Sequence, residues 1–291
     1  MRSQRRFKIL ALLASFAAAG ISSAQTRLVV TVPVADMYSS ASVDVDVVSQ
    51  AIYGATVEVL QKSAGWAKVQ TNDQYTGWIR LQDTIDSSSS GYAMSGRVAQ
   101  VSSLFAGLYR ETDVTLHAPL VIVPFETRLE IIAQGQGDAS SWYQVRLPGQ
   151  RTAWVQAGDV DLAPRRLSID ESIRLGRRFL GLTYVWGGRS SFGYDCSGFT
   201  QMLVRSRGIT MPRDADLQAA WSGAIAIQRR KLRAGDLLFF GSDADHITHT
   251  GMFIGHGHFI HDTTYDHPGV QISRLGDQPW THLLVACRRI K

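Results

Sequence analysis

Residues 183–201 read TYVWGGRSSFGYDCSGFTQ and place Cys196, one of two cysteines in the chain, between a glycine-punctuated loop and a helix-forming segment. The helical pattern runs over residues 199–204 and stops at Gly208. We therefore expect Cys196 at the N-terminal end of a helix, where unpaired backbone N–H groups stabilise a thiolate and lower the pKa of the thiol. Because a thiolate attacks carbonyl carbon atoms, the stretch predicts a cysteine nucleophile.

The composition describes a globular protein behind an export signal. The chain has 291 residues, of which 45% are hydrophobic and 19% charged, which suits two or three domains and not a disordered protein. Residues 1–24 start with basic side chains, continue with a short apolar run and end in small residues, as secretory signal peptides do. We expect an exported protein that acts in the periplasm, outside the cell or at the cell wall, without a lipid anchor or a transmembrane segment.

The charge is uneven along the rest of the chain. Residues 25–163 carry nine basic and fourteen acidic side chains, whereas residues 164–291 carry seventeen basic and eleven acidic ones. A basic C-terminal part suits an acidic substrate or is simply a solvated surface. No recognised motif and no basic–aromatic pattern accompanies it, so we expect no nucleic-acid partner.

Two cysteines in an exported protein could form one disulfide. Cys287, however, lies in the apolar run LLVAC over residues 283–287, where a buried, unreactive thiol is the simpler interpretation. A bond between the two cysteines would also prevent Cys196 from reacting. We expect two free thiols.

Two stretches of short β-type runs, residues 27–86 and 95–163, repeat each other. Trp66 and Trp78 in the first copy correspond to Trp142 and Trp154 in the second, with the same spacing of twelve residues. We predict two small all-β barrels with these tryptophans in their cores. The expected domains are a signal peptide (1–24), a first β domain (25–86), a flexible linker (87–94), a second β domain (95–163) and a C-terminal domain (164–291).

The pattern changes in the C-terminal domain. Ser168 and Glu171 have the spacing of a capping box in front of a helix, and the cysteine loop and helix follow. Four β-type runs come last, over residues 236–240, 248–254, 258–261 and 283–287. Helices first and an antiparallel sheet afterwards predict an α+β domain in papain-like order, in which a nucleophile on a helix meets a histidine from a sheet.

A cysteine nucleophile needs a base, and His249 opens one of the apolar strands. We expect residues 255–257 to form a three-residue hairpin loop, which would pair residue 251 with residue 261. His249 and His261 would then be diagonal neighbours on one face, with His261 orienting the imidazole of His249.

A zinc site is the competing interpretation, because His256, His258, His261 and Asp262 crowd into seven residues. Strand alternation sends His258 and His261 to opposite faces, which disfavours a shared metal ion. We expect no metal and no cofactor.

Five motifs, YVWGG, DCSGF, PRDADLQ, HTGMFIG and FIHD, follow one another between residues 184 and 262. In these motifs the C-terminal domain resembles the NlpC-type cell-wall cysteine peptidases, and the two repeats resemble bacterial SH3-like domains. The resemblance implies a papain-like fold and hydrolysis of the γ-D-glutamyl–diamino acid bond in peptidoglycan stem peptides. It places the nucleophile, the base and the orienting histidine on Cys196, His249 and His261.

The resemblance also implies residues that contact the substrate or the oxyanion. These are Tyr184, Asp195, Ser197, Arg213, Asp214 and Tyr75. Tyr75 and Asp195 are expected at the amino end of the substrate, which would have to be a free L-Ala. The small hydroxyl residue expected after Arg213-Asp214 is Ala215 here, so one contact of the family is missing.

Two alternatives stay open. The same thiol could serve an amidase, a transpeptidase or an acyltransferase, or the chain could be a non-catalytic wall-binding protein. The expected partner is peptidoglycan or a released murein peptide, bound by a monomer.

Overall fold

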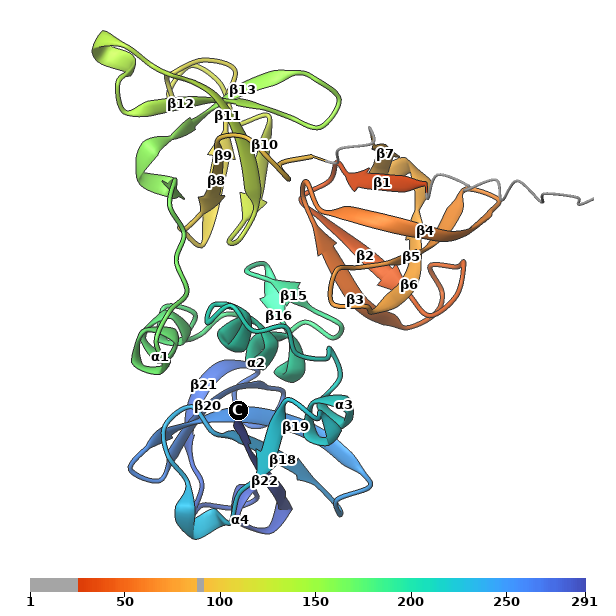
Figure 1. Ribbon diagram of the computed structural model, residues 1–291, viewed down its shortest axis with the longest axis vertical. Coiled ribbons are helices and arrows are strands. Elements are labelled where there is room, and N and C mark those ends of the chain that lie inside the picture. Colours follow the sequence, from red (N-terminus) through yellow and green to blue (C-terminus); the bar gives the residue numbers. More distant parts are fainter. Residues whose placement is uncertain (1–25, 88–91) are drawn as a thin grey trace, which may run out of the picture.

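The structure is a computed structural model that describes residues 26–87 and 92–291. The predicted signal peptide lies outside the described residues, as does the middle of the predicted linker. Figure 1 shows three parts: a first β domain (residues 26–86), a second β domain (residues 92–161) and a C-terminal domain (residues 164–291). Both β domains lie on the same side of the C-terminal domain.

The first β domain is a seven-stranded antiparallel sheet, in the order β3-β2-β6-β5-β4-β1-β7. Because side chains alternate along a strand, every second residue points inward, and Val30, Met37, Val57, Val69 and Ile79 are fully buried in one core. The strands are β1 (Arg27–Val30), β2 (Val34–Tyr38), β3 (Val47–Ile52), β4 (Thr56–Ser63), β5 (Trp66–Gln70), β6 (Thr76–Arg80) and β7 (Thr84–Asp86).

The second β domain repeats this plan with a five-stranded sheet, ordered β13-β12-β11-β8-β14, and a separate pair, β10-β9. Its core contains Val101, Leu108, Val123, Val145 and Val155, all fully buried. The strands are β8 (Val98–Val101), β9 (Phe105–Leu108), β10 (Val121–Pro124), β11 (Arg128–Gln134), β12 (Trp142–Arg146), β13 (Thr152–Gln156) and β14 (Val160–Asp161).

The repeated tryptophans do not fill the cores, so that expectation is wrong. Three of the four are only half-buried, because the alternation puts their smaller neighbours inside instead. Trp66 packs edge-on against Tyr38 with 5.4 Å between ring centroids, and Trp142, which is buried, packs in the same way against Tyr109 at 5.6 Å. What the repeat preserves is a tryptophan–tyrosine pair.

The C-terminal domain is an antiparallel six-stranded sheet, ordered β17-β22-β18-β19-β20-β21, with helices on both of its faces. Its helices are α1 (Ile169–Arg177), α2 (Cys196–Arg205), α3 (Ala215–Ala220) and α4 (Trp280–Leu283). Its strands are β15 (Arg189–Ser190), β16 (Gly193–Tyr194), β17 (Ala224–Ala226), β18 (Leu237–Gly241), β19 (Ile247–Gly255), β20 (His258–Thr263), β21 (Gly269–Arg274) and β22 (Leu284–Ile290). Strand β21 is an element that the sequence analysis missed, since it follows a Pro-Gly turn signal and holds only two apolar residues.

Helix α1 begins as predicted. Ser168 accepts a hydrogen bond from the backbone N–H of Glu171, and the Glu171 carboxylate accepts one from the backbone N–H of Ser168 at 2.9 Å. This capping box satisfies two of the N–H groups that a helix start leaves unpaired.

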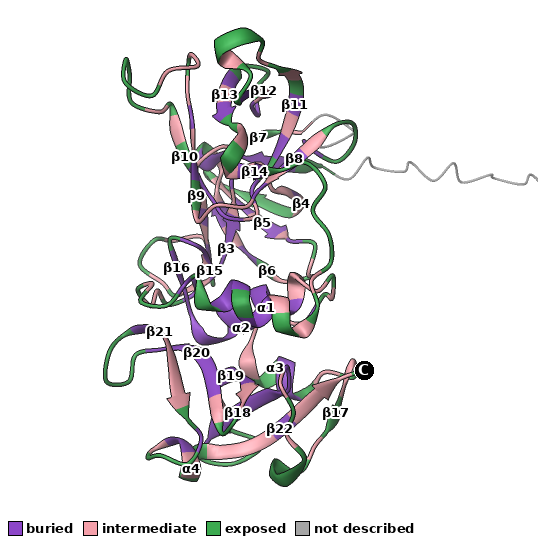
Figure 2. Cartoon of the chain, turned by 90° about the vertical axis from the view of Figure 1, so that its left-hand side faces the viewer, coloured by how far each residue is buried: buried purple, intermediate pink, exposed green. Residues whose placement is uncertain are grey.

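Helix α2 is buried along almost its whole length (Figure 2). Phe199, Met202 and Leu203 pack into one core with the sheet residues Leu237 and Phe239. On its other side, α2 faces the β15–β16 hairpin and the two β domains (Figure 1). The helix that starts with Cys196 therefore lies between the C-terminal sheet and the rest of the molecule.

No helix in the described ranges, 26–87 and 92–291, has the length and apolar character needed to cross a membrane.

Candidate active site

Cys196 is the first residue of α2, as predicted, and Asp195 is the N-cap. The Asp195 carboxylate accepts a hydrogen bond from the backbone N–H of Gly198 at 2.7 Å. Gly198 is required here because a Cβ atom at this position would lie 2.2 Å from the carbonyl oxygen of Gly188. The close approach of the glycine loop to the first turn of α2 thus explains the Cys-Ser-Gly sequence.

The thiol of Cys196 differs from the expectation of a resting thiolate. Cys196 is only 7% exposed. Burial raises the pKa of its thiol to about 12, and the charge of Asp195 contributes to the rise. Backbone N–H groups of Thr250 and Ser197 face the sulfur and lower the pKa, but by less than burial raises it. The helix start therefore offers hydrogen bonds to a developing thiolate without ionising the free thiol.

A chain of three hydrogen-bonded side chains lies on the sheet and begins at His249, the neighbour of Thr250, whose backbone N–H faces the Cys196 sulfur. His249 Nε2 lies 2.8 Å from His261 Nδ1, and His261 Nε2 lies 3.0 Å from the hydroxyl of Ser273. The three residues come from the adjacent strands β19, β20 and β21. The predicted contact between the two histidines is present, and Ser273 is a third member that the sequence did not reveal.

The hairpin between β19 and β20 has the predicted register but a different turn. The turn has two residues, His256 and Gly257, instead of three, and residues 255 and 258 pair across it. A bulge at residue 254 then shifts the register by one, so that Met252 pairs with Ile260. The bulge restores the parity that a two-residue turn would have broken.

Both imidazoles are neutral in their surroundings. Burial lowers the pKa of His249 to about 4, partly offset by the charge of Asp195. Burial, followed by the neighbouring His249, also lowers the pKa of His261. Trp280 packs against both rings, at 5.3 Å and 4.7 Å between centroids, and keeps water away from them.

Arg213 was predicted to contact the substrate, but in the structure it binds other residues of the protein. Its guanidinium forks onto Asp195 at 2.9 and 2.6 Å and donates further hydrogen bonds to the Ser197 hydroxyl, the Gly188 carbonyl and the Ser49 hydroxyl. An arginine has five N–H donors, so none is left for a ligand. Arg213 instead fixes Asp195 and Ser197, the two residues that flank the cysteine.

Tyr75 and Asp214 meet across a domain boundary. The Tyr75 hydroxyl of the first β domain donates a hydrogen bond to the Asp214 carboxylate at 3.1 Å. Burial raises the pKa of Asp214, and the neighbouring charges of Asp216 and Asp195 raise it further. A cavity of about 320 Å³ opens beside them, lined from both domains, by Asp73, Gln74, Tyr75, Thr210, Met211, Pro212, Arg213, Leu217 and Trp221.

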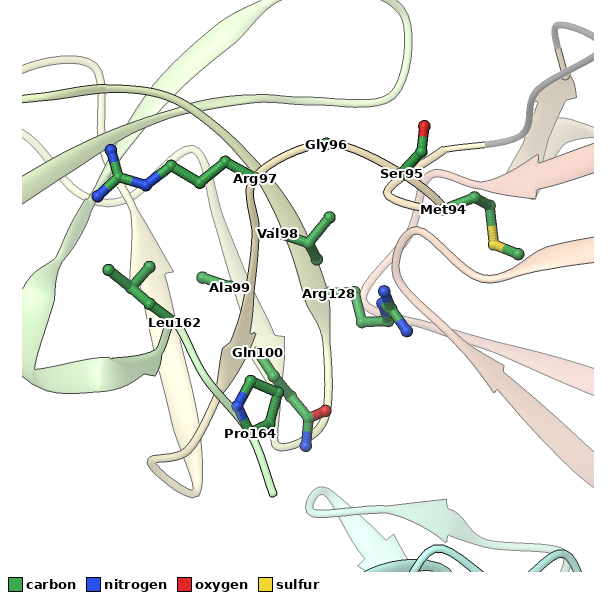
Figure 3. A pocket seen from close by; sticks show the side chains of 10 residues that line it. All are labelled: Met94, Ser95, Gly96, Arg97, Val98, Ala99, Gln100, Arg128, Leu162 and Pro164. Atoms are coloured by element: carbon green, nitrogen blue, oxygen red, sulfur yellow. The ribbon is translucent and has the colours of Figure 1, made fainter. Parts of the chain in front are cut away.

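A second cavity, of about 310 Å³, lies where the chain passes from the first β domain to the second (Figure 3). Arg97 and Arg128 are its charged residues, and Leu162 and Pro164 also line it. None of the candidate site residues lines it, whereas Tyr75 and Arg213 line the cavity between the first β domain and the C-terminal domain.

Two residues near Cys196 complete the site. Tyr184 is half-buried, and burial followed by the neighbouring Cys196 raises the pKa of its hydroxyl. Asp262, next to His261 in the chain, is fully buried with no hydrogen-bond partner for either carboxylate oxygen among the described residues. Burial and the charge of Asp195 raise the pKa of Asp262 to about 8. No sequence pattern predicts this buried acid.

Cys287 is buried in the core on the far face of the sheet, and both cysteines are free thiols. Within residues 26–87 and 92–291, no three histidine, cysteine or acidic side chains group as ligands for a metal ion.

Known proteins share these features domain by domain. The sequence profile of the NlpC/P60 family matches residues 181–289, which include Cys196, His249 and His261. The profile of the bacterial dipeptidyl-peptidase Sh3 domain matches residues 37–83, and that of the GW (Gly-Tryp) dipeptide domain matches residues 88–161. The chain belongs to the NlpC/P60 family.

Individual NlpC/P60 relatives match across the domains. A γ-D-glutamyl-L-lysine dipeptidyl-peptidase of Bacillus cereus is 33% identical over 228 residues, covering 73% of this chain and 66% of that protein. A protein of the same name from Bacillus subtilis is 29% identical over 259 residues, covering 83% of this chain and 80% of that protein. This chain thus spans about two thirds of the first relative and four fifths of the second.

A solved structure shares the whole arrangement. The crystal structure of an NlpC/P60 family protein from Bacillus cereus superposes with a TM-score of 0.78 at 26% identity, covering 91% of this chain and 99% of that one. The predicted fold class, an α+β papain-like domain behind two SH3-like domains, is confirmed.

Proposed function

We propose that this protein hydrolyses the γ-D-glutamyl–diamino acid bond of peptidoglycan stem peptides, with Cys196 as nucleophile. The chain is a peptidase of the NlpC/P60 family, and two relatives that match most of it are named for this bond. The observation that carries the proposal is the hydrogen-bonded chain His249–His261–Ser273 on the sheet, together with Cys196 at the start of α2, whose sulfur faces the backbone N–H of Thr250, the residue after His249.

The tautomers of the two histidines decide which nitrogen atom acts as the base. If the Ser273 hydroxyl accepts from His261 Nε2–H, then His261 Nδ1 is unprotonated and accepts from His249 Nε2–H. The lone pair of His249 is then on Nδ1, the ring nitrogen that does not face His261. His249 Nδ1 is therefore the atom that takes the thiol proton.

In the acylation step, this proton moves to His249 as the sulfur of Cys196 bonds to the side-chain carbonyl carbon of D-Glu. Backbone N–H groups in the first turn of α2, together with the Tyr184 hydroxyl, stabilise the oxyanion. Collapse of the intermediate breaks the C–N bond, and the diamino acid leaves with the proton from His249. Water, deprotonated by His249, then hydrolyses the thioester and restores the thiol.

The charge beside Tyr75 suits the free amino end of an L-Ala-D-Glu unit. Asp195 and Asp214 lie close enough to raise the pKa of the Tyr75 hydroxyl, with burial as the larger cause. Arg213 neutralises only one of the two carboxylates, so an ammonium group would balance the other. The first β domain closes this end of the site, which is consistent with the release of a dipeptide.

The peptidoglycan substrate implies action outside the cytoplasm. The predicted signal peptide over residues 1–24 would deliver the protein there. Processing at its end is checked by N-terminal sequencing of the protein recovered from the medium or the periplasm.

The reaction is tested by incubating L-Ala-γ-D-Glu-diaminopimelate peptides with the wild type and with Cys196→Ala. We expect L-Ala-D-Glu and a diamino-acid fragment from the wild type, and a loss of at least about 10³-fold in the variant. A folded variant with turnover near wild type would contradict the proposal. Transfer of the acyl group to an added amine, instead of hydrolysis, would indicate a transpeptidase.

A further inference from the structure

The nucleophile helix carries a polar stripe that the proposed reaction does not use. Ser197, Gln201 and Arg205 are spaced by four residues, so they lie one above another on one face of α2. Ser197 and Gln201 are buried and Arg205 is half-buried. A buried polar stripe on a helix requires partners, and two of these side chains find partners in the β domains.

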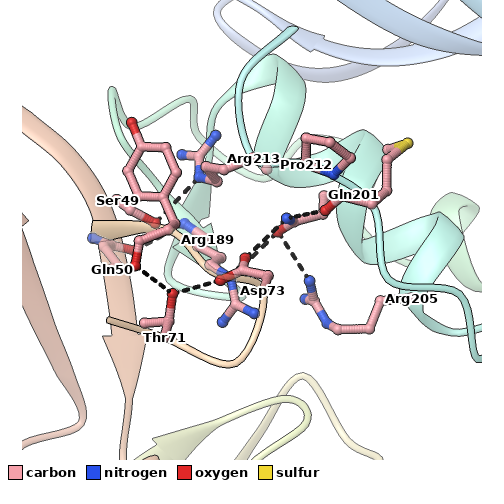
Figure 4. A network of polar contacts seen from close by, with 12 residues as sticks. Ser49, Gln50, Thr71, Asp73, Arg189, Gln201, Arg205, Pro212 and Arg213 are labelled. Atoms are coloured by element: carbon pink, nitrogen blue, oxygen red, sulfur yellow. Dashed lines mark hydrogen bonds and ion pairs between the residues drawn. The ribbon is translucent and has the colours of Figure 1, made fainter. Parts of the chain in front are cut away.

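Gln201 joins α2 to the first β domain (Figure 4). Its Nε2 donates to the Asp73 carboxylate at 3.0 Å and to the Met211 carbonyl at 2.9 Å. Its Oε1 accepts from Arg189 at 3.3 Å and from Arg205 at 3.2 Å. Three of these contacts tie the middle of the helix to its surroundings, and the fourth, from Arg205, lies within α2 itself.

Arg205 joins α2 to the second β domain. Its Nε lies 3.0 and 3.2 Å from the two carboxylate oxygens of Glu126, and its Nη2 lies 2.6 Å from one of them. The side chains are only 25% and 15% exposed. A forked arginine–carboxylate pair fixes direction as well as distance, which a single hydrogen bond does not.

The turn that presents Glu126 is itself built into the C-terminal domain. Its neighbour Phe125 packs edge-on against Phe179 at 5.6 Å between centroids, and its N–H donates to the Ser191 hydroxyl at 2.9 Å. Glu126 has a φ of 69°, a left-handed conformation that is strained for a residue other than glycine. A glycine would relieve this strain but would lose the carboxylate.

We propose that Glu126 is a positioning residue for the nucleophile. Its forked ion pair with Arg205 fixes the C-terminal end of α2, and the hydrogen bond between Asp73 and Gln201 fixes the middle. Together these two contacts set the tilt of the helix and hence the position of Cys196. Cys196 precedes Arg205 by nine residues, a rise of about 14 Å along a rigid helix. The second β domain is on this account part of the catalytic framework and not a spacer.

The inference rests on the proposed function for its kinetic readout, and Glu126→Gln tests it. The variant keeps the shape of the side chain and removes the charged fork. Assayed well below its unfolding temperature, it should show a kcat at least about fivefold lower, with KM within about twofold, because the cavity beside Tyr75 is untouched. Amide hydrogen exchange in α2 should be at least about fivefold faster.

Glu111→Gln is the matched control. Glu111 also belongs to the second β domain and pairs with an exposed histidine, His117, at 2.7 Å. Its substitution should change neither kcat nor the exchange rates in α2. A purely structural role of Glu126 would lower the unfolding temperature and leave kcat per folded molecule unchanged.

A folded Glu126→Gln protein with wild-type kcat and wild-type exchange in α2 would overturn the proposal. If that variant does not fold, the double variant Glu126→Leu/Arg205→Met replaces the ion pair with apolar side chains and leaves no unpaired charge. We expect it to fold with reduced kcat, and wild-type kcat in it would equally overturn the proposal. If the wild type cleaves no stem peptide, the proposed function fails, while exchange in α2 still decides the role of Glu126.

Discussion

At the scale of single residues, the proposed nucleophile and base are both neutral groups. The pKa of the Cys196 thiol is raised and that of the His249 imidazole is lowered, both chiefly by burial. A buried pair of this kind reacts when substrate contacts and backbone N–H groups stabilise the charges that form during proton transfer. The orientation of His249 therefore matters more than its basicity, and orientation depends on His261 and Ser273.

Ser273→Ala removes the hydroxyl that His261 Nε2 contacts at 3.0 Å. Without this partner, His261 can adopt the tautomer that donates to His249 and leaves the base unaligned. We expect kcat/KM to fall about tenfold, a small part of the 10²–10⁴-fold that a positioned base typically contributes. Steady-state kinetics measure this, and Ser273→Thr, which keeps a hydroxyl, is the control. Equal rates in the alanine and threonine variants would refute the role of Ser273.

Asp262→Asn tests the buried acid beneath the site. The pKa of Asp262 is about 8 in the folded protein against an ordinary 3.8, so between these values the folded state keeps a proton that the unfolded state releases. The free energy of unfolding of the wild type should thus fall as pH rises through this window, by up to about 1.4 kcal/mol per pH unit. The asparagine side chain does not titrate, so the variant lacks this loss of stability. Above pH 8 it should be more stable than the wild type.

Urea unfolding of both proteins across the window measures the difference, in which the contributions of all other titrating groups cancel. Parallel pH dependence in the two proteins would show that Asp262 is already ionised at neutral pH.

At the scale of elements, the sequence predicted what local patterns determine. The capping box of α1, the position of Cys196 at the start of α2 and the register between β19 and β20 all follow from spacing and alternation. The two-residue turn and its compensating bulge could not be predicted, because both solutions give the same pairing of the histidines. Ser273 was missed for a related reason: its strand, β21, has a weak pattern.

Gly198→Ala tests the close packing between α2 and the glycine loop. The added methyl group would lie 2.2 Å from the Gly188 carbonyl oxygen, so the helix start has to move. We expect a loss of about 1–3 kcal/mol in the free energy of unfolding, as for overpacked cores, and a large loss of kcat. Gly158→Ala is the matched control, since a methyl group there meets nothing within 4 Å. Equal stabilities of the two variants in chemical denaturation would contradict the packing argument.

At the scale of the whole molecule, contacts between domains complete the site. Tyr75 reaches Asp214 over a separation of 139 residues, Asp73 reaches Gln201 over 128, and Glu126 reaches Arg205 over 79. No local sequence pattern predicts such pairs. Tyr75 was therefore assigned to the site only through the family resemblance, and Asp73 and Glu126 were not predicted. The resemblance also assigned Arg213 to the substrate, although its five N–H donors are used within the protein.

Tyr75→Phe tests whether the first β domain selects peptides with a free amino end. The variant loses the hydroxyl that contacts Asp214 at 3.1 Å and keeps the ring. We expect kcat/KM for the peptide with a free amino end to fall about tenfold and kcat/KM for an N-acetylated peptide to change little. The ratio of the two kcat/KM values should therefore fall. An unchanged preference would mean that Tyr75 only packs against the C-terminal domain.

The central claim is that Cys196 cleaves one particular bond by way of a thioester. The most direct test is hydrolysis of L-Ala-γ-D-Glu-diaminopimelate in water enriched in heavy oxygen, followed by mass analysis of both products. The account predicts one heavy oxygen atom in the L-Ala-D-Glu product, none in diaminopimelate, and no products with Cys196→Ala. Label in the diamino-acid fragment, release of free L-Ala, or the same products from the alanine variant would contradict it.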